Sequence, residues 1–87
     1  LVARWPDNAM GWFALGNALH AVDEPQAAAD AFYQATEQNP KLAVAWLNLG
    51  LTQKGLGQRQ QAIASLHQAA ALPGQWQAQA KKALAEM

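Results

Sequence analysis

The segment Trp12-Phe13-Ala14-Leu15-Gly16 decides the fold of this chain, because its pattern returns 34 residues later as Trp46-Leu47-Asn48-Leu49-Gly50. The tryptophan, the leucine and the glycine are kept in the second copy. The same offset relates residues on both sides of the segment: Pro6 and Pro40, Ala28 and Ala62, Phe32 and Leu66, Ala35 and Ala69. A period of this size is typical of repeat architectures, in which neighbouring units bury a shared core. We therefore interpret the chain as two copies of one structural unit.

The first copy has the pattern of two helices joined by a turn. Apolar residues at helical spacing predict a helix from Ala9 to Val22, after a turn and N-cap at residues 6–8. The segment 23–25 ends this helix and starts a second one, because Pro25 is tolerated in a first helical turn. The second helix runs to about Gln38 and ends before Asn39-Pro40, since a residue that precedes proline is disfavoured in a helix. The first copy is thus a helical hairpin.

Small residues predict that these two helices lie close together. Gly16 lies on the first helix, and Ala28 and Ala35 lie on the second. No bulky side chain then separates the backbones, and Trp12 and Phe32 are expected to fill the space that remains.

The second copy repeats this arrangement, and a further helix follows it. We expect helices over residues 42–54 and 59–71, a turn at residues 55–57, and an end at Pro73-Gly74. A fifth helix is predicted over residues 76–86. Its apolar residues fall on one stripe, as in a helix that packs on one side only: Trp76, Ala80, Ala83, Leu84 and Met87.

The spacing within the first copy resembles the tetratricopeptide repeat family. The family's pattern of Trp, Leu and Gly, then Ala, Phe and Ala, then Pro is filled by Trp12, Leu15, Gly16, Ala28, Phe32, Ala35 and Pro40. The resemblance implies an all-α fold, a right-handed α-solenoid of two helix-turn-helix units with a C-terminal capping helix. The expected division is residues 1–7 as the end of a preceding repeat, 8–41 and 42–74 as repeats, and 75–87 as the capping helix.

Composition argues against several classes of function. Six basic residues balance six acidic residues, so no net positive charge attracts nucleic acid. No apolar run is long enough for membrane insertion, and we expect a soluble protein. The chain has no cysteine, which fits a cytoplasmic or a periplasmic location equally well.

No constellation of residues points to catalysis. His20 and His67 lie on different predicted helices, and neither has a second histidine at the spacing that metal sites on helices use. Phosphate-binding loops and nucleophile motifs are missing from the sequence. We therefore expect no enzyme activity, no metal and no cofactor.

The family resemblance implies that a protein or peptide partner binds in a concave groove formed by the first helix of each unit. We expect an apolar groove, with Phe13, Leu47 and Leu51 packing on apolar side chains of the partner and two asparagines holding its backbone. The predicted groove residues are Met10, Phe13, Asn17, His20, Val44, Leu47, Asn48, Leu51, Lys54 and Lys82.

Three alternatives remain open at this stage. Some members of the family clamp the C-terminal carboxylate of a peptide, and Asn17, Asn48 and Lys82 match places of that clamp, whereas Phe13 and Ala78 stand where basic residues are expected. A second alternative is that Asn17 and Asn48 bond to each other across adjacent helices. A third is that the repeats serve self-association or support a catalytic or other domain outside this sequence.

Overall fold

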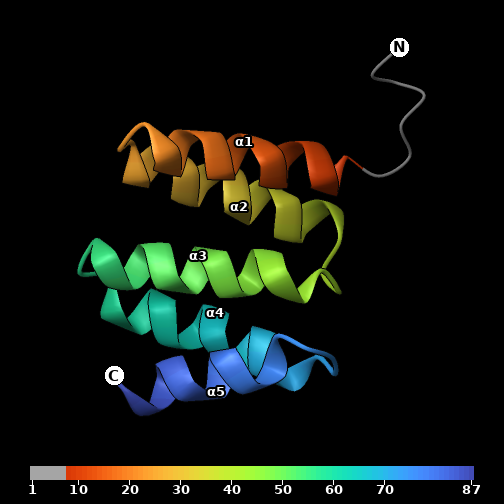
Figure 1. Cartoon of the computed structure of the whole chain (residues 1–87), viewed down its shortest axis with the longest axis vertical. Helices are drawn as coiled ribbons and strands as arrows, with labels where there is room; N and C mark the ends of the chain where they lie inside the picture. The colour runs from red at the N-terminus through yellow and green to blue at the C-terminus, as the bar shows by residue number, and fades with distance from the viewer. Residues whose placement is uncertain (1–7) are drawn as a thin grey trace.

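The computed structural model describes residues 8–87, which form five α-helices. They are α1 (Ala9–Ala21), α2 (Pro25–Gln38), α3 (Ala43–Gly55), α4 (Arg59–Ala71) and α5 (Gln77–Ala85). Figure 1 shows them stacked in chain order, with α1 at one end and α5 at the other. Each predicted helix is confirmed to within about one residue at either end. The expectations placed on residues 1–7, namely the end of a preceding repeat and part of the first turn, lie outside the described residues.

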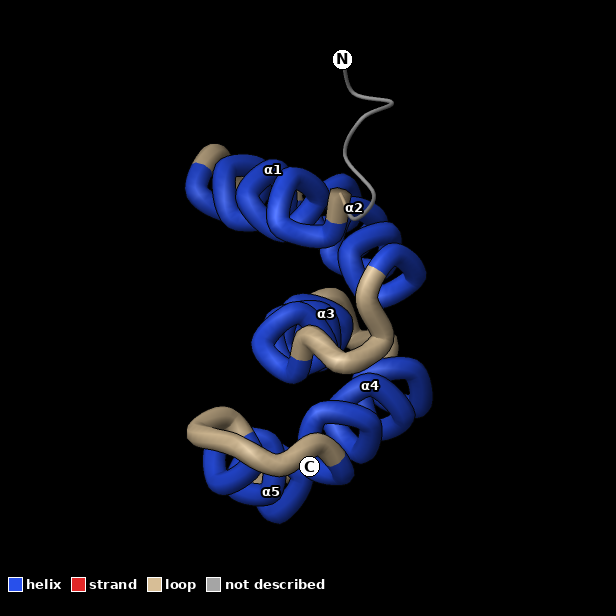
Figure 2. Tube along the Cα trace, turned by 90° about the vertical axis from the view of Figure 1, so that its right-hand side faces the viewer, coloured by secondary structure: helices blue, strands red, loops and turns tan. Residues whose placement is uncertain are grey.

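The helices alternate between two sides of the stack. In Figure 2, α1, α3 and α5 line one side, and α2 and α4 line the other. Each helix packs against the next one in the sequence, and α3 also contacts α5. This arrangement is the all-α solenoid of helical hairpins that the repeat pattern predicted.

Two glycines allow the helices of each hairpin to approach closely. A Cβ atom at Gly16 would lie 2.5 Å from the Phe32 ring, and one at Gly50 would lie 2.7 Å from Cγ of Leu66. Both distances are shorter than real Cβ contacts, so a larger residue at either position would require the neighbouring side chain or the helices to shift. The glycine of the Trp-Leu-Gly segment is therefore a packing requirement, as predicted.

The Trp46 side chain joins two clusters of buried residues. One cluster, at the α2–α3 interface, contains Ala28, Ala29, Phe32 and Leu49. The other, among α3, α4 and α5, contains Leu47, Leu66, Ala69, Ala80 and Ala83. The indole packs against both clusters, and its N–H donates a hydrogen bond of 2.8 Å to the carbonyl oxygen of Pro40. Trp46 thus fixes the α2–α3 connection to the core.

The last helix covers the end of the second hairpin with the stripe that the sequence predicted. Ala80 and Ala83 are buried, and Trp76, Leu84 and Met87 pack around them. Two contacts hold the end of the helix: Arg59 donates to the Met87 carbonyl oxygen, and Lys54 lies near Glu86. The apolar face of α5 is therefore turned to α3 and α4.

The apolar residues of α1 do not all face the core. Leu15 and Val22 belong to the apolar residues at helical spacing that predicted this helix, but they are 44% and 66% exposed. Gly16, which packs on the Phe32 ring, marks the side of α1 that meets α2. Leu15 and Val22 lie on a different side of the helix, because successive residues of a helix are turned by about 100°.

Candidate peptide-binding groove

A small hollow between α1 and α3 brings together four of the predicted groove residues. Asn17 and His20 come from α1, and Asn48 and Leu51 come from α3. Phe32 and Thr52 complete the lining, and the volume is about 190 Å³. The four residues meet because α1 and α3 lie on the same side of the stack, separated in sequence by α2 (Figure 2).

A second hollow, of about 370 Å³, lies between α3 and α5. Gln79 and Lys82 line it from α5, Glu86 lines it from the position just after that helix, and Leu51 lines it from α3. Leu51 thus belongs to both hollows, and its side chain is 43% exposed. We call the two hollows together the A-helix groove; Leu51 lies at its centre.

The two asparagines of the groove are bonded to each other. Asn48 Nδ2 donates a hydrogen bond of 3.3 Å to Asn17 Oδ1, which links α3 to α1. A carboxamide offers two donor hydrogens and an acceptor oxygen, so this bond uses only part of what each side chain offers. The pair therefore orients both amides and leaves hydrogen-bonding groups that a ligand can use.

Charged groups gather at the α5 end of the groove. Lys54 Nζ lies 3.8 Å from Glu86 Oε1, and Lys82 lines the same hollow as Glu86. The Lys54–Glu86 pair is exposed, and such pairs contribute about 0–1 kcal/mol to stability. The pairing leaves Lys82 as the unpaired charge among these three side chains.

Models of the tetratricopeptide repeat match the chain over residues 9–52 and again over residues 43–74. The chain belongs to the tetratricopeptide repeat family. A comparison with curated proteins gives no match. Tetratricopeptide repeats generally serve as protein-interaction modules, and this places protein binding ahead of catalysis for the chain.

The structure corrects the expectation that Leu47 offers its side chain to a partner. The residue borders the second hollow, but it is 2% exposed and packs with Leu66, Ala69 and Ala80 in the cluster beneath α5. In this tetratricopeptide chain α5 packs over the face of α3 that carries Leu47, so the residue is part of the core. A substitution of Leu47 therefore tests stability and gives no information about a binding surface.

Four other predicted residues, unlike Leu47, lie outside the two hollows. Phe13 is half-buried and packs on Phe32, with ring centroids 5.8 Å apart and planes tilted by 48°. Val44 is half-buried, and Met10 is exposed, but neither lines the groove. Lys54 lies beyond the second hollow and reaches it only through its pairing with Glu86. The groove is consequently more polar than the sequence indicated.

Sequence reasoning also missed residues that the structure adds to the groove. Thr52, Gln79 and Glu86 line it, although none has an unusual position in the repeat pattern. Thr52 is buried, and its hydroxyl donates to the Asn48 carbonyl oxygen at 2.7 Å. The residues that α5 contributes depend on how that helix crosses α3. The sequence of one helix alone does not determine this crossing.

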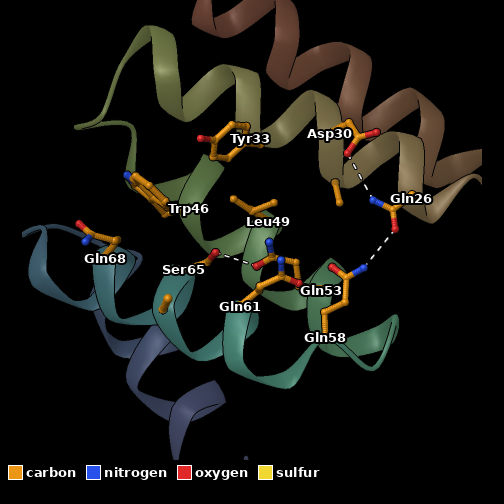
Figure 3. A pocket seen from close by; sticks show the side chains of 12 residues that line it. Gln26, Asp30, Tyr33, Trp46, Leu49, Gln53, Gln58, Gln61, Ser65 and Gln68 are labelled. Carbon is orange, nitrogen blue, oxygen red and sulfur yellow. Dashed lines mark hydrogen bonds between the residues drawn. The ribbon is translucent and has the colours of Figure 1, made fainter.

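The opposite side of the repeat carries a larger hollow between α2 and α4, of about 570 Å³ (Figure 3). Carboxamides dominate its wall: Gln26, Gln53, Gln58, Gln61 and Gln68. Gln58 donates to Gln26 at 3.1 Å, and Gln26 donates to Asp30 at 3.3 Å. The glutamine-rich segment near residue 58 thus links α4 to α2.

Tyr33 lines the same hollow, and the pKa of its hydroxyl group is shifted. A hydrogen bond to Glu37, together with the negative charge of that carboxylate, raises the pKa of Tyr33 above its ordinary value. The two side chains are one helical turn apart on α2.

Residues 8–87 contain no group of three or more His, Cys, Asp or Glu side chains placed to hold a metal ion. Across the same part of the chain, no helix has the length and apolar character needed to cross a membrane.

Proposed function

We propose that the chain is a non-catalytic module that binds an extended segment of a protein partner in the A-helix groove. The proposal rests mainly on one observation: Leu51 is exposed and lines both of the adjoining hollows. An apolar residue in a concave site, surrounded by a few polar groups of fixed orientation, is the usual form of a ligand pocket.

The chemistry of the groove defines the segment that fits it. An apolar side chain of the partner covers Leu51, and its backbone pairs with the carboxamides of Asn17 and Asn48, which their mutual bond already orients. At the α5 end, Lys82 favours a neutral or acidic residue of the partner. Because the two hollows lie on either side of Leu51, the segment runs from α1 to α5 across α3.

A peptide library displayed on phage tests the proposal, because selection finds a ligand even when the partner is unidentified. Peptides are selected on the native protein and their affinities measured by calorimetry against the variants Leu51→Glu and Leu15→Glu. Leu15 is a matched control, because it is a leucine of nearly the same exposure, 44% against 43%, on another helix and outside the groove. We expect Leu51→Glu to weaken binding by about tenfold or more, as for a central interface residue, and Leu15→Glu to leave it unchanged.

Side-chain amide signals give a second, independent readout. Addition of a selected peptide should shift the NMR resonances of Asn17 and Asn48 more than those of Gln61 and Gln68, which line the hollow on the opposite side. Peptides that bind the Leu51→Glu variant as tightly as the native protein, or that shift the glutamine signals instead, would show that the A-helix groove is not the binding surface.

Amidation of the peptide C-terminus separates this mode from a carboxylate clamp. Phe13 and Ala78 occupy the places where a clamp has basic residues, and Asn17 and Asn48 are bonded to each other. We therefore expect amidated and free peptides to bind equally. A large loss on amidation would support recognition of a C-terminus in place of an internal segment.

A further inference from the structure

The hollow between α2 and α4 is larger than either part of the A-helix groove. Its volume of about 570 Å³ compares with about 190 Å³ and 370 Å³ for the two hollows of the groove. Pockets that hold ligands commonly have volumes of about 300–1,000 Å³. Ala29 and Leu49, which are buried, and Trp46, which is half-buried, give the hollow an apolar base. We call it the glutamine hollow, after the carboxamides in its wall: Gln26, Gln53, Gln58, Gln61 and Gln68.

Hydrogen bonds between side chains hold part of this wall in place. The bonds from Gln58 to Gln26 and from Gln26 to Asp30 cross from the start of α4 to α2. Ser65 donates a further bond of 2.7 Å to Gln53 Oε1, which joins α4 to α3. Side chains that are already ordered lose less conformational freedom when a ligand binds. The wall is therefore arranged in advance of any ligand.

Two carboxamides of α4 have no hydrogen-bonding partner within residues 8–87. Gln61 and Gln68 are both exposed and both line the glutamine hollow. With Ser65 between them, they follow one line of α4 over about 10 Å, at about 1.5 Å per residue. Each carboxamide offers two donor hydrogens and an acceptor oxygen, which match the amide and carbonyl groups of a polypeptide backbone. About three residues of an extended segment span this length.

Tyr33 lies between two carboxylates on the α2 side of the hollow. The side chain is 48% exposed and lies toward the end that Trp46 lines (Figure 3). Asp30 precedes Tyr33 by three residues and Glu37 follows it by four, and both spacings place side chains on one face of a helix. Neither carboxylate forms an ion pair with a Lys, Arg or His of residues 8–87. Two uncompensated negative charges thus flank an exposed aromatic ring.

These charges select the kind of ligand that fits. None of the described residues that line the glutamine hollow is Lys, Arg or His. A Lys or Arg side chain that lies on the Tyr33 ring is attracted by the face of the ring and by the carboxylates of Asp30 and Glu37. An acidic segment is repelled by the same two groups, and a neutral sugar gains nothing from their charge.

We propose that the glutamine hollow is a second binding site, which takes an extended peptide segment with a Lys or Arg side chain on Tyr33 and its backbone along Gln61 and Gln68. The site does not depend on the A-helix groove, which lies on the other side of the stack (Figure 2). Because the groove favours a neutral or acidic residue at Lys82, the two sites select opposite charges. The chain can therefore bring two different segments together.

Peptides selected from a phage library on the Leu51→Glu variant test this site separately from the groove. We expect the selected peptides to share a Lys or Arg. Replacement of that residue by glutamine in the synthetic peptide should weaken binding by about tenfold or more in calorimetry. A selection that yields no binding peptide, or peptides whose affinity does not depend on a basic residue, would overturn the proposal.

Substitutions on α2 test the cation site. Asp30→Asn and Tyr33→Ala should each weaken binding by about tenfold, whereas Tyr33→Phe keeps the ring and should bind nearly as well as the native protein. Glu24→Gln and Gln34→Ala are matched controls, because both residues are exposed and lie outside the hollow. Circular dichroism verifies that each variant is folded. If Glu24→Gln weakens binding as much as Asp30→Asn, the net charge of the protein attracts the peptide, and the proposal is wrong.

Side-chain amide signals show where the peptide lies. A selected peptide should shift the NMR resonances of Gln61 and Gln68 and leave those of Asn17 and Asn48 in place. The reverse pattern would assign the peptide to the A-helix groove and contradict the proposal. Maltohexaose, a neutral oligosaccharide, is the second probe and should shift none of these signals. If it shifts the glutamine signals and the basic peptides do not, the hollow takes a sugar, and the proposal fails.

Discussion

Asp23 and Gly57 occupy equivalent places in the turns of the two helical hairpins, and both have a left-handed backbone, with φ angles of 62° and 80°. A Cβ atom makes this conformation unfavourable, and aspartate tolerates it better than most residues because its side chain is short and polar. The turn geometry is thus the same in both hairpins, although glycine fills the position in only one.

This equivalence predicts that Asp23→Gly stabilises the protein. Glycine adopts the left-handed region without strain, while its greater freedom in the unfolded chain offsets part of the gain. We expect the free energy of unfolding to rise by about 0.5 kcal/mol in a denaturant titration. The reverse change, Gly57→Ala, should lower it by about 1 kcal/mol. A stabilising Gly57→Ala would contradict the assigned turn geometry.

Gly16→Ala should destabilise the first hairpin, because the added methyl group meets the Phe32 ring at 2.5 Å. Overpacking of a close helix contact costs about 1–3 kcal/mol, which thermal denaturation will detect. Gly55→Ala is the control, since a Cβ atom at that position meets nothing within 4 Å. It should leave the melting temperature unchanged or raise it slightly.

Leu47 and Leu51 lie one helical turn apart on α3, and truncation should destabilise the protein far more at Leu47 than at Leu51. Leu47→Ala empties a buried site beneath α5 and should cost about 2–5 kcal/mol of stability. Leu51→Ala removes an exposed side chain and should change stability by less than about 0.5 kcal/mol. Urea titrations of both variants measure the difference, and similar costs would contradict the assignment of Leu51 to the surface.

Glu37→Gln should lower the pKa of Tyr33 toward its ordinary value. The hydrogen bond and the negative charge of Glu37 both favour the neutral phenol, and the substitution removes the charge. Tyr33 is the only tyrosine of the 87-residue chain, so its ionisation can be followed by ultraviolet absorbance. Asp30→Asn, on the same helix, serves as the control and should leave the titration curve in place.

The sequence predicted the helices well because the residues that end them act locally. Pro25 can lie only in a first turn, Asn39-Pro40 stops a helix, and the offset between Trp12 and Trp46 sets the period. The groove was predicted less well, because it depends on contacts between helices. The spacing of Leu47 and Leu51 along α3 does not show which of them α5 covers, and the sequence of α5 does not report its crossing over α3. The bond between Asn17 and Asn48 was one of the alternatives that the sequence left open, and the structure contains it.

The position of the Trp46 side chain between two buried clusters has a consequence for cooperativity. The indole packs against residues of α2 on one side and residues of α4 and α5 on the other. In arrays of repeats, the interface between neighbours decides whether the units melt one by one or in a single transition. Because the same ring belongs to both clusters, loosening of either hairpin removes packing from the other. The described helices should therefore lose their structure together, which makes this short array behave as one folding unit.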